Sequence, residues 1–355
     1  MRSKRESFPK ITIGVDLGDR ESVICEVDRR GEVVRRASIR TGRATVGEYF
    51  AGRGRCRVII EAGTHSPWVA RDVTALGHEV IVANPTRIYG TSRRKNDPKD
   101  AEFLARQGRA DPALLHPIAH RSPQAQKDLA VIRARDQLVR ARTKLINHVR
   151  GAVKAQGGRV RRCSAEVFGA RALSDLPEDT RPALLPLLEI IAGMTQTIRG
   201  YDEQIERLAR DSYPEAQRLM QPKGVGALTA IAFLLLVGDP ARFQRSREVG
   251  PYFGLVPKLN DSSESQPQLR ISKAGDELGR RLVVSAAQYI LGPFGPDCDL
   301  RRHGLKIAAR GGKNAKKRAV VAVARKLAVL LHRLWVSAAT YDPDWVLKQH
   351  AVGNP

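Results

Sequence analysis

Four carboxylates in the N-terminal third of the chain have the types and positions needed to bind a metal ion. Asp16 ends an apolar stretch in GVDLG, and Glu61 ends another in IIEAG. Asp97 and Asp100 lie three residues apart in NDPKDAEFLA, where Pro98 suits the first position of a helix. Residues with this spacing share one helix face. Carboxylates are preferred ligands of Mg²⁺ or Mn²⁺, and two such ions can promote phosphoryl transfer.

Each acid also has an ordinary structural explanation. Asp97 can cap a helix whose dipole Asp100 complements, while Asp16 and Glu61 can be turn residues. The set of four is more specific, because a carboxylate at the end of a central apolar strand costs free energy unless something compensates its charge. We therefore predict that Asp16, Glu61, Asp97 and Asp100 are metal ligands and catalytic groups.

Alternating strands and helices are expected to position these acids. The hydrophobic pattern predicts strands at residues 11–17, 22–27, 32–39, 56–61 and 79–83, and helices near 46–51 and 66–76. Three hairpin-linked strands followed by alternating helix and strand indicate a mixed α/β sheet. The first two acids then lie where strands end, and the other two lie at the start of the next helix.

Two long helices are predicted after the sheet, the first over residues 124–156. The second has an unbroken 3–4 repeat of apolar residues, typical of a coiled-coil seam. The seam comprises Leu184, Leu187, Ile191, Met194, Ile198, Tyr201, Ile205 and Leu208. It is compatible with an antiparallel hairpin within one chain and equally with a dimerisation arm.

The other segments are less regular. Residues 157–171 are rich in Gly and Arg and are expected to form a loop. Residues 219–341 are predicted to be helical, with an irregular insert at 250–272. The tail after Asp342 is expected to be poorly ordered.

The charge of the chain indicates a polyanionic partner. Among 355 residues there are 61 Lys and Arg against 37 Asp and Glu, a net charge of +24. The four cysteines are widely spaced and form no CxxC pair, which argues against a zinc site or a disulfide framework. No apolar signal segment precedes Ile11, and the longest apolar run, residues 227–237, is too short to span a bilayer. We therefore expect a cytoplasmic, nucleoid-associated protein with no membrane partner.

Three basic segments are predicted to contact nucleic acid. The first is the loop before Asp97, and the second is Lys223-Gly224-Val225-Gly226, which resembles the turn of a helix-hairpin-helix. A plain turn between two core helices explains the second segment as well. The third is the densest, with no Asp or Glu between residues 301 and 318. The predicted contacts are Arg93, Arg94, Lys95, Lys223, Gly224, Gly226, Arg310, Lys313, Lys316 and Lys317.

The ordered set of motifs resembles the DEDD transposases of bacterial insertion sequences. GVDLG, IIEAG, ANP and NDPKDAEFLA look like the N-terminal domain of that family, and KGVGALTAIAFLLLVGD, RFQRSREVGPYFGLVPK and ISKAGDELGRRLVVSAA look like its C-terminal domain. The resemblance implies an α/β RNase H-like (RuvC-like) catalytic domain over residues 1–115. It further implies a long helical coiled-coil segment over 116–215, a mainly α transposase domain over 216–341 and a tail over 342–355.

The resemblance also implies a serine nucleophile after the sequence GLVP. Family members have Ser-Gly five residues beyond the proline, where this chain has Ser262 followed by Ser263. Ser263 therefore remains an alternative to Ser262. A serine assisted by Mg²⁺ or Mn²⁺ would attack DNA and leave a phosphoserine-linked strand, without ATP.

The resemblance carries expectations about partners too. Relatives act on duplex donor and target DNA, guided by a structured non-coding bridge RNA that pairs with both. They are thought to combine the RuvC-like domain of one protomer with the serine domain of another. The chain is thus expected to form a homo-oligomer, a dimer or a tetramer.

Three other functions compete with this one. A RuvC-like metal-dependent junction nuclease would use water in place of the serine. A sugar-kinase-like or actin-like ATPase would explain GVDLG as a phosphate loop, but no second Gly-rich adenosine motif is found in the helical half. A non-catalytic nucleic-acid-binding protein is disfavoured because all four acids are present.

Overall fold

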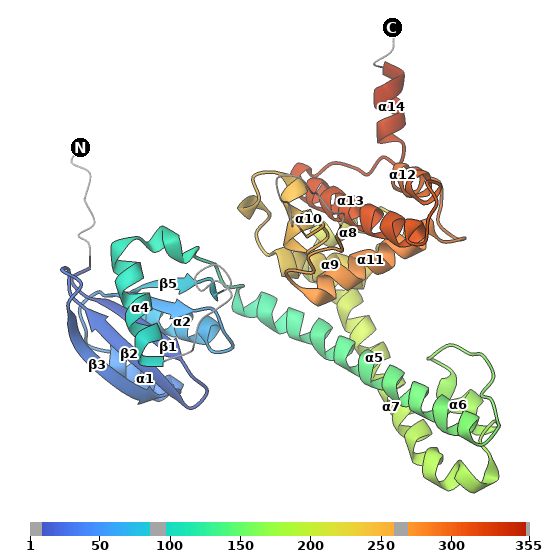
Figure 1. The fold of residues 1–355 in the computed structure, drawn as a ribbon, viewed down its shortest axis with the longest axis horizontal. Helices are drawn as coiled ribbons and strands as arrows, with labels where there is room; N and C mark the ends of the chain where they lie inside the picture. The colour runs from blue at the N-terminus through green and yellow to red at the C-terminus, as the bar shows by residue number, and fades with distance from the viewer. Residues whose placement is uncertain (1–8, 86–96, 259–268, 353–355) are drawn as a thin grey trace. The chain divides into compact units, whose positions relative to one another are not determined.

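The computed structural model describes residues 9–85, 97–258 and 269–352, with only the backbone at 97, 98 and 350–352. The chain divides into two compact units, residues 1–121 and 122–355 (Figure 1). The division of the sequence into four segments remains a prediction. In the described part of the chain, no helix is both long and apolar enough to cross a membrane.

A mixed five-stranded sheet forms the centre of the first unit, in the order β3-β2-β1-β4-β5. The strands β1, β2 and β3 pair in antiparallel hairpins, and β4 and β5 run parallel to β1. The predicted strands are confirmed to within one residue at each end. The strands are β1 (Thr12–Leu17), β2 (Glu21–Val27), β3 (Val33–Arg40), β4 (Arg57–Glu61) and β5 (Glu79–Ala83).

Helices cover both faces of this sheet. On one face, Ile13 and Val58 pack with Phe50 of α1 (Arg43–Phe50) and Val73 of α2 (Ser66–Ala75). On the other face, α4 (Asp97–Ala110) packs on the sheet through three apolar residues, Ala101, Leu104 and Ala105. The small side chains of Ala101 and Ala105 allow α4 to lie close to the strands.

Two long helices, α5 (Pro123–Ala155) and α7 (Arg181–Arg207), begin the second unit. They pack antiparallel, since Arg135 of α5 bonds to Asp202 and Arg142 bonds to Thr195. Of the two arrangements considered for the heptad helix, the single-chain hairpin is therefore present in the structure. Whether these helices also join protomers remains a prediction.

The buried stripe of α7 differs from the predicted seam at alternate positions. Leu184, Ile191, Ile198 and Ile205 are buried as predicted. Between them, Leu188 and Thr195 are buried in place of Leu187 and Met194. Thr195 is turned inward because its hydroxyl accepts a hydrogen bond from Arg142 of α5, while Leu188 packs in the apolar cluster that contains Val149 and Val153 of α5.

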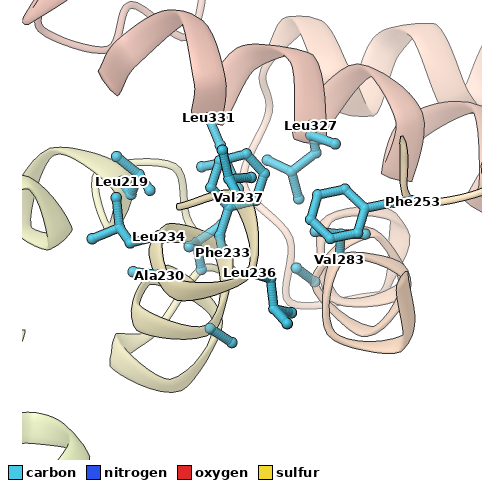
Figure 2. Packing of buried hydrophobic residues seen from close by; sticks show 14 of the residues in the cluster. Leu219, Ala230, Phe233, Leu234, Leu236, Val237, Phe253, Val283, Leu327 and Leu331 are labelled. Atoms are coloured by element: carbon cyan, nitrogen blue, oxygen red, sulfur yellow. The ribbon is translucent and has the colours of Figure 1, made fainter. Parts of the chain in front are cut away.

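The second core surrounds α9 (Ala227–Val237), whose residues 229–237 are all buried (Figure 2). Leu219, Phe253, Val283, Leu327 and Leu331 pack around it from the neighbouring helices. Those helices are α8 (Glu215–Leu219), α10 (Val249–Tyr252), α11 (Glu277–Leu291), α12 (Asp299–Ala308) and α13 (Ala315–Ser337).

Two sequence-based expectations were wrong. The stretch expected to be a loop contains a helix, α6 (Phe168–Leu173), which forms because Phe168 and Ala172 bury themselves against α5 and α7. The tail expected to be poorly ordered contains α14 (Trp345–Val352). This helix is held at its start by Asp299, whose carboxylate accepts a hydrogen bond from Val346 N at 2.7 Å.

Candidate active site and nucleic-acid surfaces

Asp16 and Glu61 occupy equivalent positions on two neighbouring parallel strands. Val15 of β1 pairs with Ile60 of β4, and the two acids are the next residues along these strands. Parallel strands end at the same edge of a sheet, and both side chains are half-buried there. The register thus brings together the first pair of predicted acids.

Both acids lie on the sheet face that α4 covers. Alternate residues of a strand share a face, so Asp16 lies on the side of Gly14 and Glu61 on that of Ile59. A Cβ atom at Gly14 would lie 2.0 Å from Ala101 O of α4, and one at Gly108 would lie 2.2 Å from Ile59 Cγ1. The helix therefore packs directly on the residues that precede the acids.

A hydrogen bond from Arg57 shows which end of α4 faces the acids. It begins β4, and its Nη1 donates to Gly108 O at 3.1 Å, near the C-terminal end of the helix. The helix therefore runs antiparallel to β4, and its first turn lies toward the edge where Asp16 and Glu61 are found. Asp100, in that first turn, is only 7% exposed.

Further side chains hold α4 on the sheet. Arg106 donates to Gly31 O at 2.7 Å, and Glu102 accepts hydrogen bonds from Arg36 and Arg106. The hydrogen bond from Arg36 is the main cause that holds the pKa of Glu102 below its usual value. Arg57 and Glu102 were not singled out in the sequence, where they are only two of many charged residues.

The donor set fits a hard divalent cation, because its members are all carboxylates. The side chain of Asp97 lies outside the described residues. Among the side chains that are described, no group of three or more His, Cys, Asp or Glu is placed to hold a metal ion. The acids thus share an edge and a face of the sheet without forming a closed ligand set.

Several predicted site residues lie outside the described part of the chain. These are Arg93, Arg94 and Lys95 of the basic loop, and Ser262 with its alternative Ser263. Their roles remain predictions. The backbone on both sides of the serine segment is described and forms the base of a hairpin, with a bridge between Pro257 and Ile271.

The turn before α9 combines an exposed cation with a tightly packed glycine. Lys223 is exposed, as a phosphate contact requires. Gly224 has φ +95°, and a Cβ atom there would lie 3.1 Å from Ala286 O of α11. Packing against α11 therefore explains this glycine, and phosphate binding is not needed to account for it. Gly226, which directly precedes α9, is exposed with open space around its Cα.

The cations of the dense basic segment have two kinds of surroundings, since some are bonded within the protein and others are exposed. Arg301 donates to Ile290 O and Gly292 O, each at 2.6 Å, and Arg302 binds the carboxylates of Asp299 and Asp344. These two arginines therefore hold helices together. The predicted nucleic-acid contacts in the segment are exposed around the turn between α12 and α13, and they are Arg310, Lys313, Lys316 and Lys317.

A groove of about 1460 Å³ lies beside these exposed cations. Apolar side chains such as Val321 and Leu330 line it, and both described ends of the serine segment border it. Its two carboxylates, Asp299 and Asp342, are paired with Arg302 and Lys348. Its cations are Arg270, Lys273, Arg302, Lys306, Lys317, Arg318, Arg325, Lys326 and Arg333.

This groove was not predicted from the sequence, although α13 offers a signal for it. Arg318, Arg325 and Arg333 recur at intervals of seven and eight residues, which places them along one side of the helix. The imidazole of His303, which also lines the groove, is affected by these positive charges. Burial, together with the nearby cations, lowers the pKa of His303.

Comparison with known proteins gives two family matches. Residues 13–156 match a model of the DEDD type described as a transposase, and residues 216–297 match one described as the transposase IS116/IS110/IS902 family. The first match covers most of the first unit and the start of the second, and the second match lies within the second unit.

Curated relatives resemble the chain over most of its length. It is 28% identical to the transposase for insertion sequence element IS1111A of Coxiella burnetii, over 96% of this chain and 94% of the relative. It is 29% identical to the transposase for insertion sequence element IS1328 of Yersinia enterocolitica, over 80% and 85%. A pilin gene-inverting protein of Moraxella bovis is 26% identical, over 76% and 77%.

Proposed function

Because this chain belongs to the DEDD transposase family of bacterial insertion sequences, and is thus a DNA recombinase, we propose that it cleaves and rejoins DNA through a phosphoserine intermediate. We assign Ser262 as the nucleophile. Asp16, Glu61, Asp97 and Asp100 would hold Mg²⁺ or Mn²⁺.

One observation carries most of this proposal. Asp16 and Glu61 follow the paired residues Val15 and Ile60 at the same edge of the sheet, and the first turn of α4 lies on the same face. Three antiparallel strands with two parallel strands added beside β1 also agree with an RNase H-like, RuvC-like domain. Asp16, Glu61 and Asp100 come from three separate segments, and their location at one edge and one face of the sheet supports the proposed metal site.

The chemistry assigned to Ser262 is a transesterification. Its Oγ attacks the phosphorus atom, a P–O bond to a sugar oxygen breaks, and the serine proton leaves to a nearby base or to solvent. The departing sugar oxygen takes up a proton and becomes a free hydroxyl. A bound divalent ion would lower the pKa of the hydroxyl and offset charge on the phosphate. Because one phosphodiester replaces another, rejoining needs no ATP.

The exposed basic side chains of the second unit support binding of duplex DNA. Lys223 and the cations of the α12–α13 turn are exposed, and the groove beside that turn is cationic at the base of the serine segment. Aromatic residues make up only 5% of the chain, so stacking on single-stranded bases is not its main mode of binding.

Two partners are inferred from the family. A structured bridge RNA would pair with donor and target DNA, and the large positive charge of the chain suits such a ligand. A dimer or tetramer would bring the serine of one protomer to the carboxylates of another. The outer faces of α5 and α7 are the surfaces we assign to this assembly.

A covalent adduct tests the proposal. Purified protein is incubated with Mg²⁺, the cognate RNA and a labelled junction substrate, and SDS-resistant protein–DNA complexes are counted. We expect Ser262→Ala to abolish the adduct and Asp16→Asn to reduce it by roughly 100-fold or more. Removing the metal with a chelator should have the same effect as Asp16→Asn.

Ser263→Ala is the matched control, because it removes the same hydroxyl one residue away. It should retain the adduct. An undiminished adduct in Ser262→Ala would refute the assignment of the nucleophile. Clean metal-dependent hydrolysis without an adduct in the wild-type protein would favour the alternative, a RuvC-like junction nuclease that uses water.

A further inference from the structure

The two chain segments that flank residues 259–268 form a tightly bonded hairpin base. Lys258 N donates to Arg270 O at 2.9 Å, Ser272 N to Val256 O at 2.8 Å, and Lys273 N to Gly254 O at 3.2 Å. This pairing fixes the positions at which the chain leaves toward Ser262 and returns from it.

Glycines allow the two limbs to approach more closely than other residues would. Gly254 has φ +65°, and a Cβ atom there would lie 2.3 Å from Ala274 O. Gly275 has φ +79°, and its Cβ atom would lie 2.0 Å from Tyr252 O. The close approach leaves several carbonyl groups pointing into the same small space.

Arg280 binds these carbonyl groups from α11. Its Nη1 lies 2.9 Å from Lys273 O, 3.1 Å from Ala274 O and 3.3 Å from Phe253 O. Lys273 and Ala274 belong to the segment after residue 268, and Phe253 belongs to the segment before residue 259. Phe253 itself is fully buried in the second core (Figure 2). One guanidinium group thus ties both limbs to the core.

The helix that carries Arg280 is anchored independently of the hairpin. Asp276 caps it by accepting from Gly279 N at 2.9 Å. Arg281 binds Asp136 of α5 at 2.6 Å, and Glu277 binds Arg140 of α5 at 2.7 Å. The first turn of α11 is therefore a fixed platform, held by α5 through residues other than Arg280.

We infer that Arg280 is a positioning residue for the serine segment. It holds the hairpin base at a set position on α11, and with it the two ends from which the serine segment extends. This inference rests on the proposed function. Misplacing a reacting group by about 1 Å can reduce a rate by about 100-fold, so a role of this kind has a measurable effect without contact with DNA.

The neighbouring arginine provides a matched control. Arg280→Ala and Arg281→Ala each remove one guanidinium group from the same turn of α11, but only the first contacts the hairpin. Without Arg281, the Asp276 cap and the Glu277–Arg140 ion pair still hold this turn. At saturating DNA, we expect Arg280→Ala to lower the rate of adduct formation by about 10- to 100-fold, with the Kd for DNA unchanged. Arg280→Lys should recover part of the rate, and added guanidinium ion should partly rescue Arg280→Ala.

Hydrogen exchange measures how firmly the hairpin base is held, and it needs no catalytic activity. In Arg280→Ala, the amides of Lys258, Ser272 and Lys273 should exchange faster than in the wild-type protein and in Arg281→Ala. Equal exchange in the two variants, or a normal adduct rate in Arg280→Ala, would overturn the inference. If the wild-type protein forms no adduct, or Ser262→Ala still forms one, the proposed function fails, and this inference fails with it.

Discussion

Gly14 sets the distance between the sheet and α4. A Cβ atom at this position would lie 2.0 Å from Ala101 O and 2.5 Å from Ala105 N, both of which are backbone atoms. Backbone atoms of a packed helix cannot move aside as the end of a flexible side chain can. The position of Asp100 relative to Asp16 therefore depends on the missing side chain of Gly14.

We predict that Gly14→Ala destabilises the first unit. Forcing one extra carbon into this contact should lower the free energy of unfolding by about 1–3 kcal/mol. It should also reduce DNA cleavage, because α4 must shift away from β1. Denaturant unfolding and the adduct assay measure these two effects.

Gly47→Ala is the control for this prediction. Gly47 lies inside α1, and a Cβ atom there would have nothing within 4 Å. Alanine favours helix by up to about 1 kcal/mol relative to glycine, so this variant should be at least as stable as the wild-type protein. Equal stability of the two variants would contradict the packing argument.

Helix α14 is held by a small set of polar contacts. Arg302 of α12 binds Asp297, Asp299 and Asp344, and Asp299 N donates to Pro343 O at 2.8 Å. Trp345 and Leu347 remain 42% and 50% exposed, so apolar burial contributes little. The order of this helix therefore depends mainly on Arg302 and its carboxylates, with a further contact from Arg333, whose guanidinium lies 4.3 Å from the centroid of the Trp345 ring.

We predict that Arg302→Ala releases α14. The carboxylates of Asp299 and Asp344 would then repel each other without a cation between them. Hydrogen exchange in residues 343–349 should become faster by about tenfold or more, as expected for the loss of a charge-assisted hydrogen bond. Lys306→Ala removes an exposed cation from the same helix and should leave this exchange unchanged. Protection of α14 that persists in Arg302→Ala would mean that other contacts, such as that of Arg333 with Trp345, are enough to hold it.

Across the whole chain, the net charge of +24 is divided between two kinds of cation. Many arginines are paired within the protein, as Arg43 is with Asp72 and Arg161 with Asp175. Others, such as Lys316 and Lys317, are exposed beside the groove. Only the second kind is suited to replace counterions on a phosphate backbone.

We predict that these two kinds differ in the salt dependence of DNA binding. Lys316→Ala with Lys317→Ala should weaken binding and reduce the slope of log K against log salt by about 0.9 for each phosphate that the protein no longer neutralises. Arg43→Ala with Arg161→Ala changes the net charge equally, but should leave the slope nearly unchanged. Fluorescence anisotropy between about 50 and 200 mM salt measures both. Equal slopes for the two double variants would show that the net charge of the protein, and not the position of each cation, sets the salt dependence of DNA binding.

Much of this protein follows from local sequence. The strands of the first unit, the long helices and the order of the family motifs were predicted from alternation, helical periodicity and turn residues, which depend on neighbours along the chain. Asp16 and Glu61 could be predicted as metal ligands from local sequence too, since each ends an apolar strand. The positions of Ser262 and Arg93 lie outside the described residues, so those predictions stand as they were made.

The remaining features depend on contacts between distant segments. Nothing in the sequence distinguishes Arg280 from Arg281, yet one binds the hairpin base and the other binds α5. Likewise, the sequence favoured Leu187 and Met194 for the seam of α7, while the arginines of α5 bring Thr195 inward. The adjacency of Asp16 and Glu61 requires the parallel pairing of β1 with β4, which are about 45 residues apart. Sequence patterns indicate which residues can be buried and which are charged. The contacts of each side chain depend on which distant segments pack against it, and only the tertiary structure determines this.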